Sequence, residues 1–494
     1  MRRFAMGDVS VADMAAAREA RAMRQQRLLM QRGALVCLTM NIPGPHKTSP
    51  LIAIAFEEGK RLIAQTLPGA ALTHELRDKT GFEAYYQAAD DPLTVKRALC
   101  TVEDTTPLGR LFDIDVLTPA GDKVSREALG LPPRQCFLCG NPAFVCARSR
   151  AHSVQALTAE IDRRILALYR ERTIAHLSRA AVEALEQEAR TTPKPGLVDA
   201  RNCGSHPDMS LPLLLRSAHA LAGYFAQCAA LGFDCAEEEL FPALQTAGMQ
   251  AEADMLAATG GVNTHKGAVF SLGVLCAAAA QCAARFEDTP QAVCRAAGER
   301  IRPAVEAHFA GLTAAHSFGE RLYLQAGIRG IRGEAAEGFP SIMAVWPDFV
   351  REAAQLSRQE AGVRAVIRLL SRMQDTTLLK RGGQAGQAFA QAQARRIEAA
   401  GFPEAEIEAL DEAMIARNLT CGGCADLLAC LFVFVKLAHG EYGIHQRDDS
   451  VDHEVFGNGI FQKESLGNRP RIGQASRFDN NTVEADFAAF AFVC

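Results

Sequence analysis

The sequence has little aromatic surface, little net charge and no apolar run long enough to cross a membrane. Its 494 residues include one tryptophan and six tyrosines, too few to predict a surface on which nucleic-acid bases stack. The formal net charge of −4 predicts no overall attraction to nucleic acid or to an anionic membrane. The longest apolar runs, near 267–280 and 427–435, are shorter than the ~20 residues that span a bilayer, and they predict buried helices.

A secretory leader is also lacking, because no apolar segment follows the first residues, Met1-Arg2-Arg3-Phe4. Fifteen cysteines in such a chain predict reduced thiols in the cytoplasm. What the sequence does have is a globular composition, with 48% hydrophobic and 22% charged residues. A chain of this length is expected to form two or three domains.

Two buried strands are predicted in the first third of the chain. Residues 35–40 are an apolar run, and the Pro- and Gly-containing loop after them holds Lys47 either against a ligand or in a plain tight turn. Within 109–116, strand alternation places Asp113 and Asp115 on one face and apolar side chains on the other. Carboxylates spaced in this way suit Mg²⁺ beside a triphosphate, with Arg110 nearby; a solvent-facing strand is the alternative.

A cysteine-rich segment follows, with the spacing C-x2-C-x6-C-x5-H at Cys136, Cys139, Cys146 and His152. This spacing is similar to that of structural zinc sites. Arg148 and Arg150 lie between the last two members. Because the last two spacings are unusual for zinc, small half-buried thiols beside a basic loop are the favoured interpretation.

The segments 41–45, 109–116 and 136–153 resemble the apo-citrate lyase phosphoribosyl-dephospho-CoA transferase family, and the resemblance covers most of residues 8–165. It implies transfer of a phosphoribosyl-dephospho-CoA group to a serine of the citrate lyase acyl carrier protein, the gamma subunit, with release of pyrophosphate. In this interpretation Asp113 and Asp115 are catalytic carboxylates that hold a metal ion. The candidate triphosphate contacts are Lys47, Arg110, Arg148 and Arg150.

Beyond residue 168 almost every segment has a helical pattern, and no convincing alternating strand appears. We therefore predict an N-terminal α+β domain (1–168), a larger all-α domain (169–440) and a polar tail (441–494) that is either disordered or loosely docked. The junction falls in a charged helical stretch, 156–190, that lacks the composition of a flexible tether. Helices are predicted at 211–231, 237–257, 268–285, 291–310, 341–356, 362–373, 386–400 and 426–437.

Polar, glycine-bearing loops recur between these helices, and we expect them to form one shared site. They lie at 192–199, 204–208, 259–267, 330–334 and 375–383. The loop 259–267 combines three glycines with Asn263, His265 and Lys266 before a helix, an arrangement that suits phosphate. It lacks the Walker A spacing, and a Gly-rich turn between helices is the alternative.

As a set these loops resemble the triphosphoribosyl-dephospho-CoA synthase family over about residues 174–438. The chain departs from the family pattern at Ser210, Cys421 and Cys424. The resemblance implies that the 2′-hydroxyl of 3′-dephospho-CoA attacks the ribose C1′ of ATP. Adenine then leaves while the triphosphate stays on the sugar.

Such a glycosyl transfer needs a base for the hydroxyl, a hydrogen-bond donor for adenine and cations that hold the triphosphate. His265 and Glu334 are the candidates for proton transfer. The substrate-binding candidates are Lys194, Asn263, Lys266, Arg332 and Arg381. Mg²⁺, bound with ATP, is expected on Asp199, Asp208, Glu252 or Asp375.

The two resemblances together predict a cytoplasmic bifunctional transferase whose second domain makes the substrate of the first. The expected partners are ATP, 3′-dephospho-CoA and the citrate lyase carrier protein, with no nucleic acid and no membrane. Two alternatives stay open. The same prosthetic group would serve a malonate decarboxylase carrier, or the chain would be a non-catalytic, nucleotide-sensing helical module beside a zinc-stabilised interaction domain.

Overall fold

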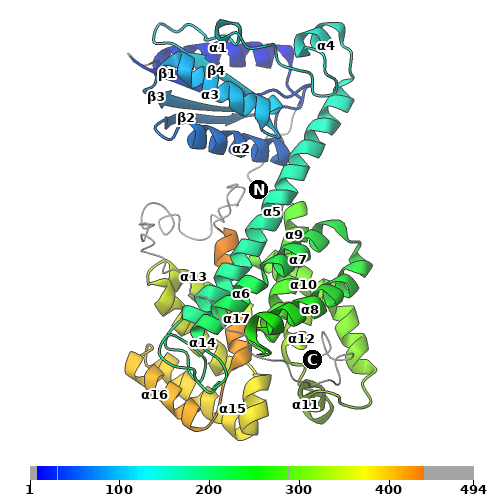
Figure 1. Cartoon of the computed structure of the whole chain (residues 1–494), viewed down its shortest axis with the longest axis vertical. Helices are drawn as coiled ribbons and strands as arrows, with labels where there is room; N and C mark the ends of the chain where they lie inside the picture. The colour runs from blue at the N-terminus through cyan, green and yellow to red at the C-terminus, as the bar shows by residue number, and fades with distance from the viewer. Residues whose placement is uncertain (1–7, 30–31, 288, 439–494) are drawn as a thin grey trace, which may run out of the picture. The chain divides into compact units, whose positions relative to one another are not determined.

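The computed structural model describes residues 8–29, 32–287 and 289–438, which divide into two compact units between His176 and Leu177. The division falls inside α5, a continuous helix of 37 residues at Val154–Arg190 (Figure 1). The helical pattern predicted across the junction is therefore present. The tail 441–494 lies outside the described residues.

Unit 1 is built on a four-stranded antiparallel sheet with the strand order β2-β3-β1-β4. The strands are β1 (Ala34–Met40), β2 (Ala71–Asp78), β3 (Gly81–Ala88) and β4 (Phe112–Leu117). Both predicted strands are confirmed as β1 and β4. In β4 the apolar residues Phe112, Ile114 and Val116 are fully buried, and Asp113 is exposed, as the alternation predicts.

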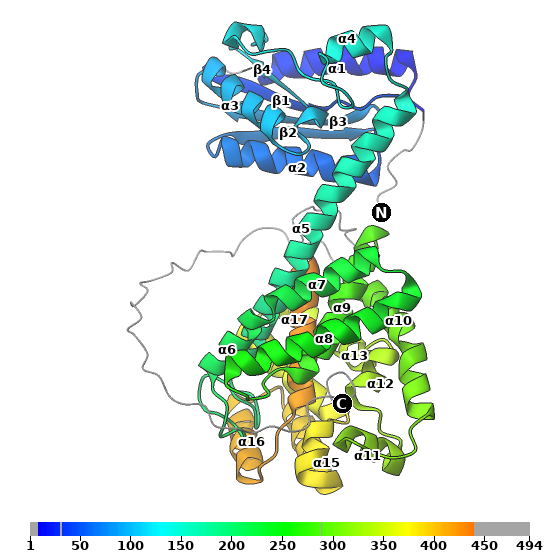
Figure 2. The same cartoon turned by 45° about the vertical axis from the view of Figure 1, so that its right-hand side comes forward.

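Helices cover both faces of this sheet (Figures 1 and 2). The helices of the unit are α1 (Val11–Leu28), α2 (Pro50–Thr66), α3 (Pro92–Thr105), the short α4 (Ala143–Ser149) and the 3-10 turns η1 (Gly109–Leu111) and η2 (Glu127–Leu129). On the α2 side, a Cβ on Gly59 would lie 3.0 Å from the Phe112 ring. On the α1 side, Leu28 packs against Leu35 and Tyr85. Asp113 and Asp115 therefore lie on the α1 side of the sheet.

Unit 2 is helical throughout its described residues, which confirms the all-α prediction. After the end of α5 its helices are α6 (Leu211–Ala220), α7 (Ala222–Asp234), α8 (Glu237–Thr259), α9 (Lys266–Ala284), α10 (Pro290–Ala310), α11 (Phe318–Ala326), α12 (Gly330–Ala336), α13 (Pro340–Ala353), α14 (Arg358–Arg372), α15 (Thr376–Ala399), α16 (Glu404–Ala416) and α17 (Gly422–Ala438). The predicted helix 211–231 is two helices, because the chain breaks at Leu221.

Helix α9 forms the core of unit 2, and every residue from Ala268 to Cys282 is buried. It packs against α7, α8, α10 and α17. The approach of α7 depends on Gly232, where a Cβ would lie 2.2 Å from the carbonyl oxygen of Ala277. By length and hydropathy α9 is a candidate membrane span, but 83% of that window is buried in the protein. The apolar run at 267–280 is thus a core helix, as predicted.

Candidate active sites

A cavity of about 660 Å³ in unit 2 is lined by residues from all five predicted loops. The loops contribute, in chain order, Lys194, His206, His265, Glu334 and Thr376. Segments that lie far apart in the sequence therefore meet at one site, as expected. Two of them are not loops, however, because 330–334 lies in α12 and 376–383 in α15. The volume is within the range of small-molecule and cofactor sites.

Three helices begin at this cavity. The first residues of α9 (Lys266, Gly267), of α15 (Thr376, Thr377) and of α17 (Gly422, Gly423) all line it. The first N–H groups of a helix have no partner within the helix, and the helix dipole adds partial positive charge there. At α15 and α17 some of these N–H groups already donate to the Asp375 carboxylate, so it is the helix dipoles at this cavity that favour an anionic ligand.

His265 lies in the cavity wall as the N-cap of α9, with 5% of its surface exposed. Its Nδ1 is 2.8 Å from Ser217 Oγ, which is 2.7 Å from Thr264 Oγ1. Its Nε2 has no hydrogen-bond partner among the described residues. Burial, followed by the charge of Lys194, lowers the pKa of His265 to about 4, so the imidazole is neutral at pH 7.

The two lysines of the cavity are each paired with a glutamate. Lys194, with 1% of its surface exposed, donates from Nζ to the carbonyl oxygen of Glu188 at 2.7 Å and to Glu188 Oε1 at 2.5 Å. Lys266 Nζ lies 3.0 Å from Glu252 Oε2. Asn263 lines the cavity beside Lys266. These pairs hold the two ammonium groups in place, so their positions need little rearrangement when an anion binds.

Glu334 also lines the cavity, from within the short helix α12. It accepts hydrogen bonds from Ser341 N at 2.7 Å and from Ser341 Oγ at 3.0 Å. Burial raises the pKa of Glu334, and the bonds from Ser341 offset part of that rise. A buried glutamate with a raised pKa is a candidate general base or acid.

Asp426 is a cavity residue that the sequence interpretation missed. Burial, then the nearby Glu188 and Asp375, raise its pKa well above the ordinary value. Gly267 fits against this carboxylate, because a Cβ at that position would lie 1.9 Å from Asp426 Oδ2. In the sequence, Asp426 could have been found from the Gly-Gly-Cys-Ala-Asp segment at 422–426, in which only the cysteine drew attention.

All four carboxylates predicted to bind Mg²⁺ in unit 2, including Glu252, are missing from the residues that line the cavity. Asp375 is fully buried as the N-cap of α15 and accepts from the backbone N–H groups of Thr377 and Cys424. Asp199 accepts from Lys194 N and from Arg201 N, and so shapes its own loop. Asp208 is exposed. These three aspartates therefore bind backbone N–H groups or face solvent, and they do not face the cavity.

Two predicted arginines also lie elsewhere. Arg381 donates to the carbonyl oxygen of Ser205 at 2.6 Å and to Asn418 Oδ1 at 2.8 Å, so it ties two loops together. Arg332 lines a neighbouring cavity and lies 2.9 Å from His308 Nε2. Neither arginine lines the first cavity, although Arg381 lies 3.4 Å from Nδ1 of His206, which does.

The carboxylates that do face the cavity fit a magnesium ion better than the predicted set. Glu188 and Asp426 both line it, and they are close enough to repel each other electrostatically. Carboxylate oxygens are the protein ligands that Mg²⁺ prefers, and a divalent ion relieves such repulsion. Glu188 pairs with Lys194 just as Glu252 pairs with Lys266, but Glu252 is not among the residues that line the cavity.

In unit 1 the two aspartates of β4 lie beside basic residues. Asp115 Oδ1 is 2.5 Å from Lys123 Nζ, and Asp113 Oδ1 is 3.7 Å from Arg134 Nη1. Arg134 was not predicted; it also donates to the carbonyl oxygens of Gly109 at 3.1 Å and of Phe112 at 2.5 Å. The side chain of Asp113 is 51% exposed and so is open to a ligand.

The predicted cations of unit 1 are not all gathered at these aspartates. Arg110 donates from Nε to the carbonyl oxygen of Gln135, and burial, followed by Arg134, lowers its pKa to about 10. Lys47 donates to the carbonyl oxygen of Ile42 at 2.5 Å, and burial lowers its pKa. Arg148 and Arg150 are exposed, at the end of α4. Arg134 contacts Phe112 and Asp113 of β4, Lys123 pairs with Asp115, and Arg110 precedes the strand in sequence.

Comparison with known families accounts for both units. The family model described as ATP:dephospho-CoA triphosphoribosyl transferase matches residues 174–443, and the one described as apo-citrate lyase phosphoribosyl-dephospho-CoA transferase matches residues 9–168. The chain belongs to both families. The residues matched by the first family model include all five segments that line the cavity. The residues matched by the second include Asp113 and Asp115.

Relatives with the same two-part arrangement cover nearly the whole chain. Protein CitXG of Haemophilus influenzae is 35% identical over 87% of this chain and 96% of its own length. Protein CitXG of Leuconostoc mesenteroides is 30% identical over 85% of this chain and 95% of its own length. The 2-(5''-triphosphoribosyl)-3'-dephosphocoenzyme-A synthase of Pectobacterium atrosepticum is 36% identical over 55% of this chain and 93% of its own length.

Proposed function

We propose that this chain is a bifunctional transferase of the citrate lyase prosthetic group. Unit 2 joins ATP to 3′-dephospho-CoA, which gives 2′-(5″-triphosphoribosyl)-3′-dephospho-CoA and adenine. Unit 1 transfers this product to a serine of the citrate lyase acyl carrier protein and releases pyrophosphate. The observation that carries the proposal is the presence of both family matches in one chain. The composition and the reduced cysteines of the described residues support a cytoplasmic enzyme.

The triphosphate of ATP binds at the three helix N-termini of the unit 2 cavity. The positive ends of the α9, α15 and α17 helix dipoles face the phosphates, and Lys194 and Lys266 add positive charge. Asn263 supplies an amide donor beside them. Because these positively charged and polar groups are held in fixed positions, the triphosphate stays bound and intact while the bond to adenine breaks.

The reaction forms the bond between the 2′-oxygen of dephospho-CoA and C1′ of the ATP ribose, and it breaks the bond between C1′ and adenine. Glu334 takes the proton of the attacking hydroxyl, since its buried carboxylate has a raised pKa. The departing adenine takes up one proton and leaves as the neutral base. His265 is neutral, and its unpaired Nε2 offers a hydrogen bond to adenine.

Glu188 and Asp426 would hold Mg²⁺ with the triphosphate, because both carboxylates line the cavity next to Lys194. When bound, the ion neutralises phosphate charge. Glu252 positions Lys266 through their ion pair.

In unit 1 the exposed Asp113 and the neighbouring Asp115 are the carboxylates placed to hold a metal ion with the triphosphate of the intermediate. Arg134, within 3.7 Å of Asp113, and Arg110 are the nearby guanidinium groups for phosphate oxygens. Joining both activities in one chain raises the local concentration of the intermediate at unit 1.

Adenine release from ATP tests the proposed activity of unit 2. Chromatography should show adenine only when ATP, Mg²⁺ and 3′-dephospho-CoA are all present. A nucleotide-sensing module would bind ATP and release no adenine. Release of adenine without 3′-dephospho-CoA would instead indicate a hydrolase and would contradict the proposed acceptor.

A further inference from the structure

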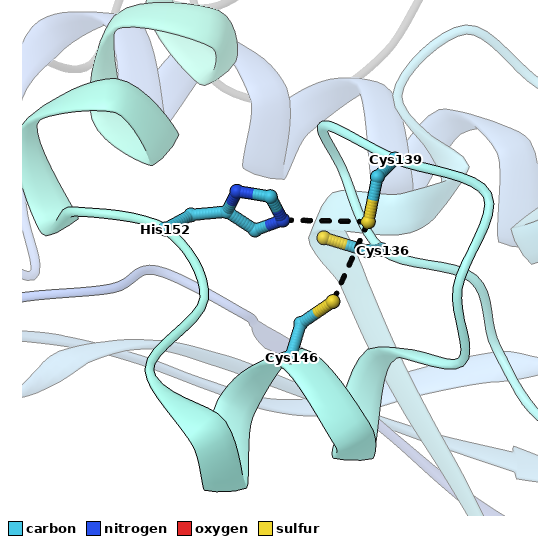
Figure 3. Close-up of side chains that lie close together, drawn as sticks. All are labelled: Cys136, Cys139, Cys146 and His152. Carbon is cyan, nitrogen blue, oxygen red and sulfur yellow. Dashed lines mark hydrogen bonds between the residues drawn. The ribbon is translucent and has the colours of Figure 1, made fainter.

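Four metal-ligating side chains lie together in unit 1, away from the sheet (Figure 3). The ligand atoms of Cys136, Cys139, Cys146 and His152 are all within 4.8 Å of one another. Cys139 Sγ is 3.4 Å from Cys146 Sγ and 3.3 Å from His152 Nε2. A tetrahedral zinc ion, with bonds of ~2.3 Å to sulfur and ~2.0 Å to nitrogen, spaces its ligand atoms about 3.4 to 3.8 Å apart. A small inward movement of the side chains closes the set around such an ion.

The backbone presents these ligands from two differently folded segments. The first is a tight turn, closed by bonds from Cys136 N to Asn141 O at 2.9 Å and from Ala143 N to Arg134 O at 2.8 Å. This turn brings Cys136 and Cys139 to the other two ligands.

The second segment is α4 and the residues after it. Cys146 faces the cluster from inside α4 and is buried. The helix ends at Arg150, whose left-handed conformation (φ 49°) turns the chain so that His152 meets the cysteines. The x6 and x5 spacings, which look unusual in the sequence, thus arise because α4 and the turn after it bring Cys146 and His152 to the same place.

The segment that carries the cluster has little apolar core of its own. Between residues 118 and 153 the buried hydrophobic side chains are Val124 and Cys146. Leu138, Phe144 and Val145 of the same segment are 39%, 52% and 44% exposed. So little apolar burial does not offset the conformational entropy lost when this segment becomes ordered. Binding of a metal ion supplies the free energy needed to keep the segment folded.

We propose that Cys136, Cys139, Cys146 and His152 bind one structural zinc ion. Three thiolates and one imidazole fill all four tetrahedral positions, so the ion has no open position for water or substrate. The interpretation of these residues as unconnected thiols, which the sequence favoured, does not account for the convergence of four ligand atoms from two segments.

The zinc ion also fixes the residues that contact Arg110. Gln135, next to Cys136, accepts a hydrogen bond from Arg110 Nε. The Phe137 ring lies 4.9 Å from the Arg110 guanidinium. The Cys136–Cys139 turn is thus a positioning element for Arg110, which the proposed carrier-loading site of unit 1 uses; this second step rests on the proposed function.

Metal analysis of the full chain tests the site directly. Protein from zinc-supplemented cells should hold one zinc per chain by inductively coupled plasma mass spectrometry. Cobalt(II) in its place should give the thiolate charge-transfer band and the strong visible bands of a tetrahedral site. Cys139→Ser should lose both metals, whereas Cys235→Ser, a control at the end of α7 in unit 2, should keep them.

Less than a tenth of an equivalent of zinc in the wild-type chain, or iron in its place, would overturn the assignment. So would an intact mass lower by two hydrogens that maps to a Cys139–Cys146 disulfide. The functional arm is separate: removal of zinc by a chelator should lower carrier loading at least tenfold and leave adenine release unchanged. If the zinc-free chain loads the carrier as well as the wild type does, the positioning role for Arg110 is wrong. The zinc assignment itself is decided by the metal analysis alone.

Discussion

At the scale of single residues, burial determines what the titratable groups of the unit 2 cavity can do. His265 is neutral because it is buried next to Lys194, and Glu334 has a raised pKa because its burial outweighs the hydrogen bonds from Ser341. Neither property is visible in a sequence. The residue types at the loops were predictable, but their ionisation depends on neighbours that only the folded chain supplies.

Glu334→Gln should lower the kcat of adenine release at least a hundredfold, because the amide accepts no proton from the hydroxyl. In the wild-type enzyme the activity should rise with pH through a pKa above that of an ordinary glutamate, since the base must be ionised and burial raises its pKa. The variant should lack this rise. Glu306→Gln, an exposed change on α10, is the control. An unaltered pH profile in Glu334→Gln would exclude it as the base.

Gly267→Ala should damage the site through Asp426. The new Cβ would lie 1.9 Å from Asp426 Oδ2, so the carboxylate or the start of α9 must shift. We expect a fall of more than tenfold in adenine release and a loss of about 1–3 kcal/mol in the free energy of unfolding. Gly319→Ala in α11 meets no atom within 4 Å and should instead stabilise by about 0.5–1 kcal/mol. Calorimetry and the adenine assay on both variants check this; equal behaviour would contradict it.

The acidic residues show where sequence interpretation stopped. Asp375 and Asp199 stand in polar, glycine-bearing loops and look like ligands, yet their oxygens accept backbone N–H bonds. Asp426 begins an apolar helix and looks structural, yet it faces the cavity. A carboxylate that caps a helix and one that holds a metal have the same sequence signature, and only the surrounding donors distinguish them.

At the scale of elements, amphipathic periodicity predicted most of the long helices of unit 2, but it missed α11 and α16, assigned α12 to a loop and did not show the breaks within helices. Leu221 separates α6 from α7, and Gly383 interrupts α15 with a φ of 58°. The strands β1 and β4 were predicted from their apolar content, but β2 and β3 were not. None of the residues of β2 is buried, whereas most of β3 is, so exposure explains the miss at β2 and not at β3.

The pairing of α13 with α14 depends on a buried ion pair. Arg368 donates to Glu352 from both Nη atoms, at 2.6 and 2.8 Å. Arg368→Met should cost about 3 kcal/mol in the free energy of unfolding at pH 7, because it leaves Glu352 buried with a weaker partner, Arg364. Arg351→Met, which removes an exposed pair with Asp348, should cost less than about 1 kcal/mol. Denaturant unfolding measures both.

The same pair gives a pH dependence with a definite sign. Burial alone would raise the pKa of Glu352, but the bonds from Arg368 lower it below the ordinary glutamate value. A lowered folded-state pKa means that the pair stabilises the protein above the unfolded pKa of glutamate. This stability is lost as the pH falls through the folded pKa. The difference in stability between wild type and Arg368→Met should therefore shrink in acid; a constant difference from pH 7 to pH 3 would contradict it.

At the scale of the whole molecule, the chain is two enzymes whose reactions follow one another. Asp113→Asn should abolish loading of the carrier protein and leave adenine release unchanged, because Asp113 belongs to unit 1 and the cavity to unit 2. Asp122→Asn, an exposed change in the same unit, should leave both activities intact. Equal loss of both activities in Asp113→Asn would contradict this division of labour. Intact mass of the carrier and chromatography of adenine measure the two activities in one sample.

The most direct test of the account is the mass of the citrate lyase acyl carrier protein after incubation with the full chain, ATP, Mg²⁺ and 3′-dephospho-CoA. The account predicts that one serine of the carrier gains the mass of a phosphoribosyl-dephospho-CoA group, and that omission of either ATP or 3′-dephospho-CoA prevents the gain. A carrier that keeps its original mass in the complete mixture, or one that gains mass without ATP, would contradict it.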